Sequence, residues 1–361
     1  MTGRQTIRTG IVGVGNCASA LLQGLSFYRV SNDDSARIGM LHPYCGPYRA
    51  QDIMVVSAFD VSRDKVGLRL DEAAYASPNN TLDFSPIMRS EVVVARGPTL
   101  DGLGSTLSET ITESELPAVD VARLLRDTET EVLVSYLPVG SEKAARFYAE
   151  AALEAECAFI NCMPAFIASD PQWSARFNAQ GLPLIGDDIK SQLGATIVHR
   201  ALANLFRERG LSLDRQYQLN FGGNSDFLNM LDRERLQSKK ISKTQAVTSQ
   251  MDCPPHPYAI HIGPSDFVPW LDDRKVCHIR MEGRGFGQAP ITIDVRLEVW
   301  DSPNSAGIVI DAIRCAKIAR DRGLGGPLLG PSAWFMKSPP QQFTDAVART
   351  MTLAFIGEQE A

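Results

Sequence analysis

The stretch TGIVGVGNCASALLQGLSFY, residues 9–28, decides the fold class. A short apolar run ends in glycine, a glycine-rich turn follows, and the pattern becomes helical from Asn16 onward. The turn fits GxGxxG/A, in which the first glycine permits a tight turn and the second lets the backbone approach a pyrophosphate. The N-terminus of the following helix then points its N–H groups at the phosphates. The stretch predicts a dinucleotide site formed by Gly13, Gly15, Asn16 and Cys17.

A second feature supports this interpretation. The buried-type strand at 53–60 ends in Asp60, the position of the acid that binds the adenosine ribose in such folds. About 45 residues separate Gly15 from Asp60, where roughly 20 is usual, and the excess is polar and rich in turns. We therefore expect an inserted loop between the first helix and the second strand. A carboxylate here favours NAD over NADP, whose 2′-phosphate it repels. The alternative is that Asp60 is simply an acid at a strand end.

Strand and helix patterns go on alternating as far as residue 188, which is typical of a parallel, doubly wound α/β sheet of the Rossmann type. Ligands bind at the carboxyl ends of such strands. Besides the glycine-rich turn, the residues expected at this edge are Asp60, Ser135, Asn161, Asp187 and Asp188.

The pattern changes after about residue 210. Residues 276–282 and 291–300 alternate apolar and polar side chains, as antiparallel strands with one wet face do. We therefore expect a second domain, built on an antiparallel sheet, at about 193–302. Residues 304–323 return to helical periodicity, and a Gly/Pro-rich tail follows.

Composition narrows the class of protein. The chain has 361 residues, 44% hydrophobic and 22% charged, with a net charge of −6. This balance argues against a nucleic-acid binder, and no apolar run approaches the roughly 18 residues of a membrane span. The seven cysteines are scattered without a CxxC pattern, and the N-terminus shows no signal-peptide core, so we expect reduced thiols in a cytoplasmic protein.

Polar segments that packing does not explain occur in the second half of the chain. The most unusual is SKKISK, 238–243, because Lys239 and Lys243 repel each other on one helix face. A solvated basic face is the ordinary explanation. In GDDIKS, Ser191 is a natural N-cap for the helix that follows. The other segments are NFGGNSD at 220–226, EVWDSPNSAG at 298–307 and WFMKSPP at 334–340.

Together these segments resemble one family. GVGNCAS, SYLPVGSE, GDDIKSQ, GGNSDFLNML, SKKISKTQAV, WLDDRK, VWDSPNSAG and MKSPP are similar, in order, to motifs of myo-inositol-1-phosphate synthases of the short, actinobacterial type. The resemblance implies an NAD-dependent, redox-neutral cyclisation of glucose 6-phosphate to inositol phosphate in a homotetramer. It also implies that the catalytic and tetramerisation domain is an insertion. The resulting division is 1–192, 193–302 and a return to the Rossmann domain at 303–361.

The resemblance also implies the site residues. Catalytic roles fall on Lys239, Lys243, Lys275, Lys337, Asp188, Asp226 and Asp301. Substrate binding falls on Ser191, Asn220, Asn224 and Lys243, and Asp188, Ser191, Asp226 and Lys239 join the cofactor residues. Eukaryotic members read KSGQT where this chain reads KSQLGAT, which leaves phosphate contacts beyond Ser191 open. A divalent or monovalent cation is also left open, as is the role of 251–261.

Within this scheme the lysines lie inside an active site. Lys239 would act as acid/base at the C5 oxygen, with a pKa lowered by the neighbouring lysines. Lys243 and Ser191 would hold the phosphate, and Lys240 would be structural. Two alternatives remain: an NAD-dependent sugar or polyol dehydrogenase, which would release NADH, and a non-enzymatic NAD sensor.

Overall fold

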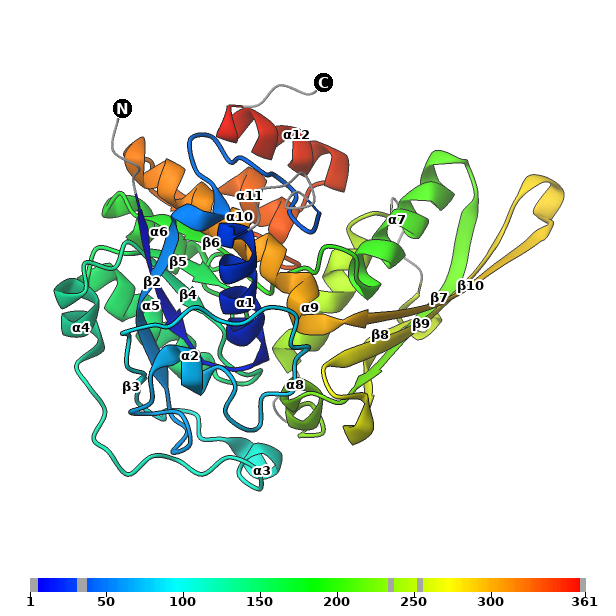
Figure 1. The fold of residues 1–361 in the computed structure, drawn as a ribbon. Helices are drawn as coiled ribbons and strands as arrows, with labels where there is room; N and C mark the ends of the chain where they lie inside the picture. Colours follow the sequence, from blue (N-terminus) through cyan, green and yellow to red (C-terminus); the bar gives the residue numbers. More distant parts are fainter. Residues whose placement is uncertain (1–5, 31–37, 233–236, 252–255, 358–361) are drawn as a thin grey trace.

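Two β-sheets organise the chain, the larger at the left of Figure 1 and the smaller at the right. The computed structural model describes residues 6–30, 38–232, 237–251 and 256–357. Within these ranges the larger sheet has seven strands in the order β11-β6-β5-β4-β1-β2-β3, and every neighbouring pair is parallel. The strands are β1 (Ile7–Val12), β2 (Ile53–Asp60), β3 (Ala95–Arg96), β4 (Val132–Ser135), β5 (Ala158–Asn161), β6 (Pro183–Ile185) and β11 (Gly326–Pro327). The predicted Rossmann-type α/β fold is confirmed.

Helices cover both faces of this sheet. One face packs against α1 (Asn16–Val30) and α10 (Asp301–Asp321), which contribute Leu21, Leu25, Val309 and Ile313 to the main apolar core. The other face packs against α4 (Val121–Asp127), α5 (Glu142–Glu154) and α6 (Pro171–Ala179) in a second core. Short helices α2 (Leu70–Ala73) and α3 (Gly104–Leu107) lie in the connection between β2 and β4.

The smaller sheet has the order β10-β9-β7-β8. Its strands are β7 (Ser212–Gly222), β8 (Ile260–Phe267), β9 (Arg274–Arg284) and β10 (Pro290–Trp300). The predicted antiparallel pairing holds for β7, β9 and β10, but β7 and β8 are parallel. The purely antiparallel prediction was wrong because β8 follows a helical crossover, which returns the chain in the same direction.

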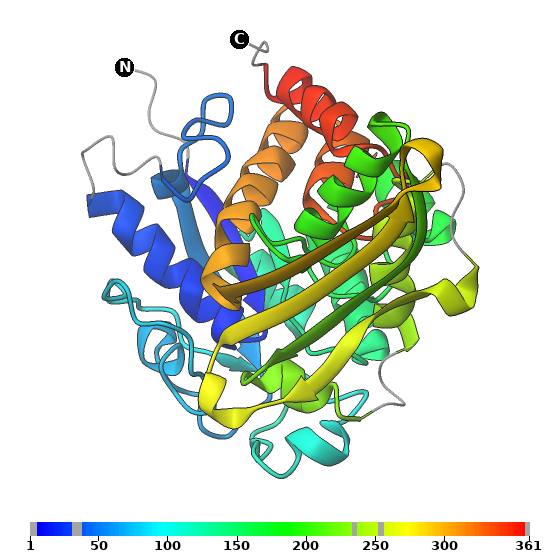
Figure 2. The ribbon, with the colours of Figure 1, turned by 90° about the vertical axis from the view of Figure 1, so that its right-hand side faces the viewer.

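One face of the smaller sheet is covered and the other is open, as Figure 2 shows. Helix α7 (Ala195–Glu208) packs Phe206 against Ile279 and Met281 of β9 on the covered face, and α9 (Gln237–Thr248) contacts α7. Helix α8 (Ser225–Asn229) follows β7 directly. Tyr217 and Leu219 of β7 are more than a third exposed.

The tail after residue 323 is more regular than its Gly/Pro content indicates. Helices α11 (Leu329–Phe335) and α12 (Asp345–Ile356) pack on each other, and Leu353 and Ile356 join the core that α10 and α1 share. The sequence analysis missed both helices because prolines and glycines surround them. No helix within the described ranges is long and apolar enough to cross a membrane.

Candidate functional site

A cavity of about 280 Å³ lies where the carboxyl ends of the parallel strands meet the smaller sheet. Its walls come from the loops after β1, β2, β4, β5 and β6, from α8 and α9, and from the β10–α10 junction. The predicted site residues that line it are Gly13, Gly15, Asn16, Cys17, Asp60, Asp188, Ser191, Asn224, Asp226, Lys243, Lys275, Asp301 and Lys337.

The glycine-rich turn forms the nucleotide half of the cavity. Gly13 has φ +88°, and a Cβ there would lie 2.8 Å from the carbonyl oxygen of Tyr136, so only glycine fits. A Cβ on Gly15 would meet no atom within 4 Å, which leaves room above the turn. Helix α1 begins at Asn16, so its first N–H groups point toward this space. The turn has the form that a pyrophosphate requires.

Three side chains fix the backbone of Val14 in this turn. Asp60 accepts a hydrogen bond from the Val14 N–H at 2.8 Å. Lys65, which is buried, donates to the Val14 carbonyl oxygen at 2.7 Å, and Asn79 donates to the same oxygen at 3.1 Å. Asp60 also accepts from the N–H groups of Val61 and Ser62. The Asp60 carboxylate is therefore held in place beside the turn.

Apolar side chains also line the cavity, among them those of Phe59, Leu103, Leu107 and Tyr148. A flat aromatic base fits against such a surface, because stacking and apolar contact need no particular hydrogen-bond partner.

Residues 186–191 divide their polar side chains between the cavity and the protein interior. Asp188 and Ser191 line the cavity. Asp187 instead accepts from Asn161 at 2.7 Å and from Ser169, and burial raises its pKa to about 6. Lys190 donates to the Ala333 carbonyl oxygen at 2.7 Å. Asp187 and Asn161, expected at the carboxyl edge of the sheet, are therefore wholly buried partners of each other.

Asp188 connects two elements that lie far apart in the sequence. One carboxylate oxygen accepts from Nζ of Lys337 at 2.8 Å, and the other accepts from Oγ of Ser242 at 2.6 Å. Asp188 has φ +63°, a left-handed conformation that aspartate tolerates better than most residues. The Ser242 contact joins the loop after β6 to α9, the helix that carries Lys243.

Lys275 and Asp301 form the second ion pair of the cavity. Nζ of Lys275 lies 3.1 Å and 3.3 Å from the two carboxylate oxygens of Asp301. Burial lowers the pKa of Lys275, but the charge and hydrogen bonds of Asp301, with Asp226 and Asp188 beyond, outweigh it and raise the pKa above the ordinary lysine value. Lys275 is therefore a lasting cation, which suits charge stabilisation better than proton shuttling.

Helices α8 and α9 bring further predicted residues to the wall. Asn224 caps α8 by accepting from the N–H groups of Asp226 and Phe227 at 3.1 Å and 3.2 Å. Asp226 then lines the cavity from the first turn of α8. Lys243 of α9 is almost fully buried and lines the cavity as well.

Two predicted residues whose side chains the structure describes, Ser135 and Asn220, are not among those that line the cavity. Ser135 is fully buried at the end of β4. Asn220 lies in β7, where its side chain donates to the Gly263 carbonyl oxygen at 2.8 Å. Lys239 and Lys240 lie in α9, but their side chains fall outside the part that the structure describes.

The predicted capping role of Ser191 was wrong. Helix α7 begins at Ala195, and its N-cap is Gly194. The intervening residues, Gln192 and Leu193, instead bind the α10 residue Asn304: Gln192 N–H donates to its carbonyl oxygen at 2.9 Å. Ser191 still lies close to the helix start, since a Cβ on Gly194 would lie 3.3 Å from its Oγ.

The sequence analysis missed Lys65, Asp273 and Ser242. Each is buried and binds a part of the predicted site: Lys65 binds Val14 of the glycine-rich turn, Asp273 binds Asn16 and Asn224, and Ser242 binds Asp188. Asp273 stands two residues before Lys275 in WLDDRK, and Ser242 stands directly before Lys243 in SKKISK. A polar residue beside a candidate catalytic lysine was the available signal.

Cys17 brings a thiol group to the cavity wall. Burial, followed by the charges of Asp273 and Asp301, raises the pKa of the Cys17 thiol to about 12, so it stays protonated and is a poor nucleophile. Among the described residues, no group of three or more His, Cys, Asp or Glu side chains is arranged to hold a metal ion.

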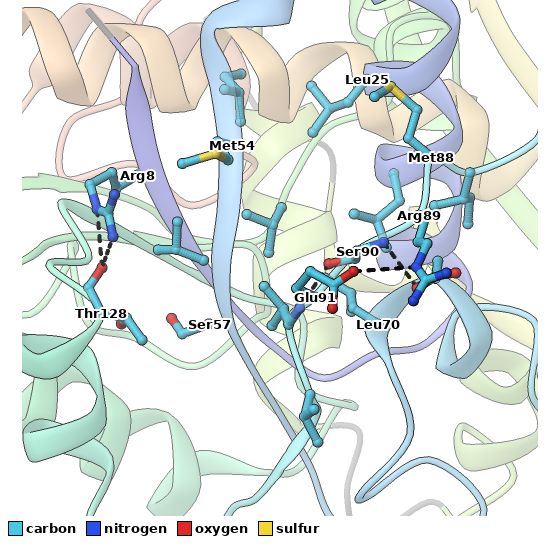
Figure 3. Close-up of a pocket in the computed structure, with 18 of the residues that line it drawn as sticks. Arg8, Leu25, Met54, Ser57, Leu70, Met88, Arg89, Ser90, Glu91 and Thr128 are labelled. Carbon is cyan, nitrogen blue, oxygen red and sulfur yellow. Dashed lines mark hydrogen bonds and ion pairs between the residues drawn. The ribbon is translucent and has the colours of Figure 1, made fainter.

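A larger cavity, of about 800 Å³, lies at the opposite, amino-terminal end of the strands. Figure 3 shows Leu25, Met54 and Met88 around it, with Arg8 bonded to Thr128 on one side. None of the predicted site residues lines it. Convergent polar groups, rather than volume, therefore distinguish the candidate site.

The comparisons with known proteins agree with the resemblance seen in the sequence. A family model described as myo-inositol-1-phosphate synthase matches residues 194–302. The inositol-3-phosphate synthase of Mycolicibacterium smegmatis is 55% identical over 354 residues, which cover 97% of this chain and 98% of the relative. The inositol-3-phosphate synthase of Corynebacterium glutamicum is 55% identical over 360 residues, which cover 98% and 99%.

A solved structure is similar over almost the same length. The crystal structure of a protein called Ari2 matches with a TM-score of 0.76 and 35% identity, covering 97% of this chain and 99% of that one. The similarity therefore extends over the residues of both sheets.

Proposed function

The chain belongs to the myo-inositol-1-phosphate synthase family, and we propose that the cavity between its sheets is the active site, with NAD as cofactor. The chain is an enzyme of the isomerase class that cyclises glucose 6-phosphate to inositol 1-phosphate. One observation supports the placement of the active site in this cavity. Thirteen of the predicted site residues line this one cavity, although the residues come from both sheets.

The residues around the glycine-rich turn fit NAD. Gly13 and Gly15 leave space at the N-terminus of α1 for a pyrophosphate, and the apolar side chains of the wall would accept an adenine. Asp60 keeps a lone pair for ribose hydroxyls while it accepts three backbone N–H groups. Its negative charge disfavours the 2′-phosphate of NADP. When bound, NAD supplies the hydride acceptor and, later, the hydride donor at C5.

The polar half of the cavity fits the substrate and its intermediates. Lys243 and Ser191, both on the wall, would bind the phosphate dianion. Lys275 and Lys337 would stabilise the negative charge that develops on the enolate and aldehyde oxygens during ring closure. Both lysines are held in place by carboxylates, those of Asp301 and Asp188. This arrangement costs no reorganisation at the moment of reaction.

Lys239 is the remaining candidate for proton transfer. Lys275 is unsuited to this role, because its raised pKa keeps it protonated. Lys239 lies one helical turn before Lys243 on α9, and positions i and i+4 share a helix face. We assign Lys239 as the acid/base at the C5 oxygen, and Asp226 as a residue that orients lysines or substrate hydroxyls.

Substitution of Lys243 tests the placement of the phosphate. Lys243→Met keeps the stem but removes a charge-assisted hydrogen bond, so glucose 6-phosphate affinity should fall about ten- to a hundredfold. NAD affinity should change little. Lys143→Met, on the exposed surface of α5, is the matched control and should match wild type. Unaltered substrate affinity in Lys243→Met would mean that the phosphate binds elsewhere.

We also propose a homotetramer, assembled through the open face of the smaller sheet. Tyr217 and Leu219 lie exposed there, beside the stacked rings of Phe221 and His278. A sheet face with such residues is a candidate for contact with another copy. Light scattering should give four times the chain mass of 39.5 kDa, and a monomeric mass would contradict this proposal. We propose the same division of the chain at residues 192 and 302, and a cytoplasmic location.

A further inference from the structure

Asp273 is a buried carboxylate that four separate segments of the chain share. Its Oδ1 accepts from Nδ2 of Asn16 at 3.2 Å, from Nδ2 of Asn224 at 2.8 Å and from Oγ of Ser302 at 2.9 Å. Its Oδ2 accepts from Oγ1 of Thr81 at 2.7 Å and from the Ser302 N–H at 3.1 Å. The residue has no exposed surface and does not line the cavity.

On one side, the partners of Asp273 lead to the nucleotide half of the cavity. Asn16 is the first residue of α1, directly after the glycine-rich turn. Asn16 and Asn80 hold each other through two hydrogen bonds, of 2.7 Å and 2.9 Å, and Thr81 follows Asn80. Asp273 thus binds the turn directly and also through the segment that packs against it.

On the other side, the partners lead to the catalytic half. Asn224 caps α8, which carries Asp226. Ser302 follows Asp301, whose backbone N–H donates to the Asp273 carbonyl oxygen at 2.9 Å. Lys275, the partner of Asp301, lies two residues further along the chain than Asp273.

All five groups around the carboxylate are N–H or O–H groups. Burial and the charge of Asp301 raise the pKa of Asp273, while the hydrogen bonds from Thr81, Asn224 and Ser302 lower it and favour the ionised form. An asparagine has the same shape but only one acceptor oxygen, and its NH₂ group would face donors. Asparagine at position 273 would therefore lose hydrogen bonds that connect these segments, without creating a cavity.

We propose that Asp273 is a positioning residue that fixes the nucleotide turn and the Lys275–Asp301 pair relative to each other. The reacting carbon must lie close to the hydride acceptor while the same substrate is held by the lysines. A misplacement of about 1 Å can cost on the order of a hundredfold in rate. This inference rests on the proposed placement of NAD and substrate. The phosphate residues Ser191 and Lys243 are not partners of the Asp273 carboxylate, so phosphate binding should not depend on it.

The test compares Asp273→Asn with Asp272→Asn. Asp272 is the exposed neighbour, and asparagine has almost the same size and shape as aspartate, so its variant is the matched control. For Asp273→Asn we expect kcat to fall about ten- to a hundredfold. The Kd for NAD, by calorimetry, should rise about tenfold because Asn16 loses its charged partner. The KM for glucose 6-phosphate should stay within about twofold, since the phosphate contacts are intact.

A double-mutant cycle on NAD affinity separates positioning from general stability. Asn16→Ala and Asp273→Asn should each raise the Kd for NAD. The Kd of the double variant should exceed that of wild type by a factor clearly smaller than the product of the two single-variant factors. If Asp273→Asn does not fold, Thr81→Val removes one partner and keeps the charge. It should raise the Kd for NAD a few-fold at unaltered KM for glucose 6-phosphate.

Each outcome decides between explanations. An Asp273→Asn variant that matches Asp272→Asn in kcat and in NAD affinity overturns the inference. A lower fraction of active enzyme with unaltered Kd values also overturns it, because that result indicates a structural role alone. Independent effects in the cycle, or a Thr81→Val variant that binds NAD like wild type, count against it equally. A wild-type chain that does not bind NAD would instead remove the proposed function.

Discussion

The nucleotide half of the cavity is held by hydrogen bonds to backbone atoms, whereas the catalytic half is held by contacts between side chains. Asp60, Lys65 and Asn79 all bind the backbone of Val14. In the other half, Lys337 meets Asp188 and Lys275 meets Asp301 through ion pairs. Backbone groups are present in every residue, but an ion pair exists only if both side chains are present. Single substitutions should therefore affect the catalytic half more severely.

The largest expected effect is on proton transfer. Lys239→Met should lower kcat by about a hundred- to ten-thousandfold, because a positioned acid/base typically contributes that much. NAD affinity should fall much less than kcat, because the predicted pyrophosphate and ribose contacts come from the glycine-rich turn and Asp60 and not from α9. Steady-state kinetics with calorimetry of NAD measures both quantities.

Lys240→Met is the control for Lys239→Met. Lys240 is the next residue of α9, and neighbouring positions of an α-helix are about 100° apart, so the loss of Lys240 should stay within a few-fold of wild type. Similar, mild effects of both changes would indicate instead that the lysines belong to a solvated helix face. An inactive Lys240→Met enzyme would show that the helix face is assigned wrongly.

A smaller effect is expected at Asp60 in the nucleotide half. Asp60→Ala removes charge-assisted hydrogen bonds worth about 1.5–3 kcal/mol, so NAD affinity should fall about ten- to a hundredfold. NADP affinity should fall less, because the repulsion of its 2′-phosphate is relieved. Calorimetry with both nucleotides measures the gap. Comparable affinity of the wild-type protein for NAD and NADP would count against the ribose role.

The smallest effect is expected at Ser242. Ser242→Ala removes one of the two side-chain partners of Asp188 and leaves the ion pair with Lys337 in place. A single hydrogen bond contributes about 0.5–1.5 kcal/mol, so kcat/KM should fall by a few-fold to about tenfold. Ser249→Ala, directly after the end of α9, serves as the control and should have a smaller effect. A larger loss than in Lys239→Met would reverse the order of effects proposed for α9.

The sequence predicted most of what depends on local pattern. The glycine-rich turn, Asp60 and the alternation of strands and helices as far as residue 188 follow from periodicity and short motifs, and the structure has them. The identities of Asp188, Lys275, Asp301 and Lys337 came from motifs of a recognised family, and all four line the cavity. Their pairing was not predicted, because Asp188 and Lys337 are 149 residues apart in the sequence.

Other features could not be predicted because they depend on tertiary packing. Asp273 looks like a surface acid in WLDDRK, and only the fold brings Asn16, Thr81 and Ser302 to it. Asp187 and Asp188 are adjacent in sequence, yet a change of backbone conformation at Asp188 turns them to different sides. The parallel pairing of β8 likewise depends on a crossover and not on the strand pattern.

The central claim is that both halves of the cavity act on one substrate molecule without net oxidation. The most direct measurement incubates the purified chain with glucose 6-phosphate and a small amount of NAD, and follows inositol phosphate and NADH together. We predict that inositol phosphate exceeds the added NAD many times over, while the absorbance of NADH does not accumulate. NADH formed in equal amount to an oxidised sugar phosphate, without inositol phosphate, would contradict the account and indicate a simple dehydrogenase.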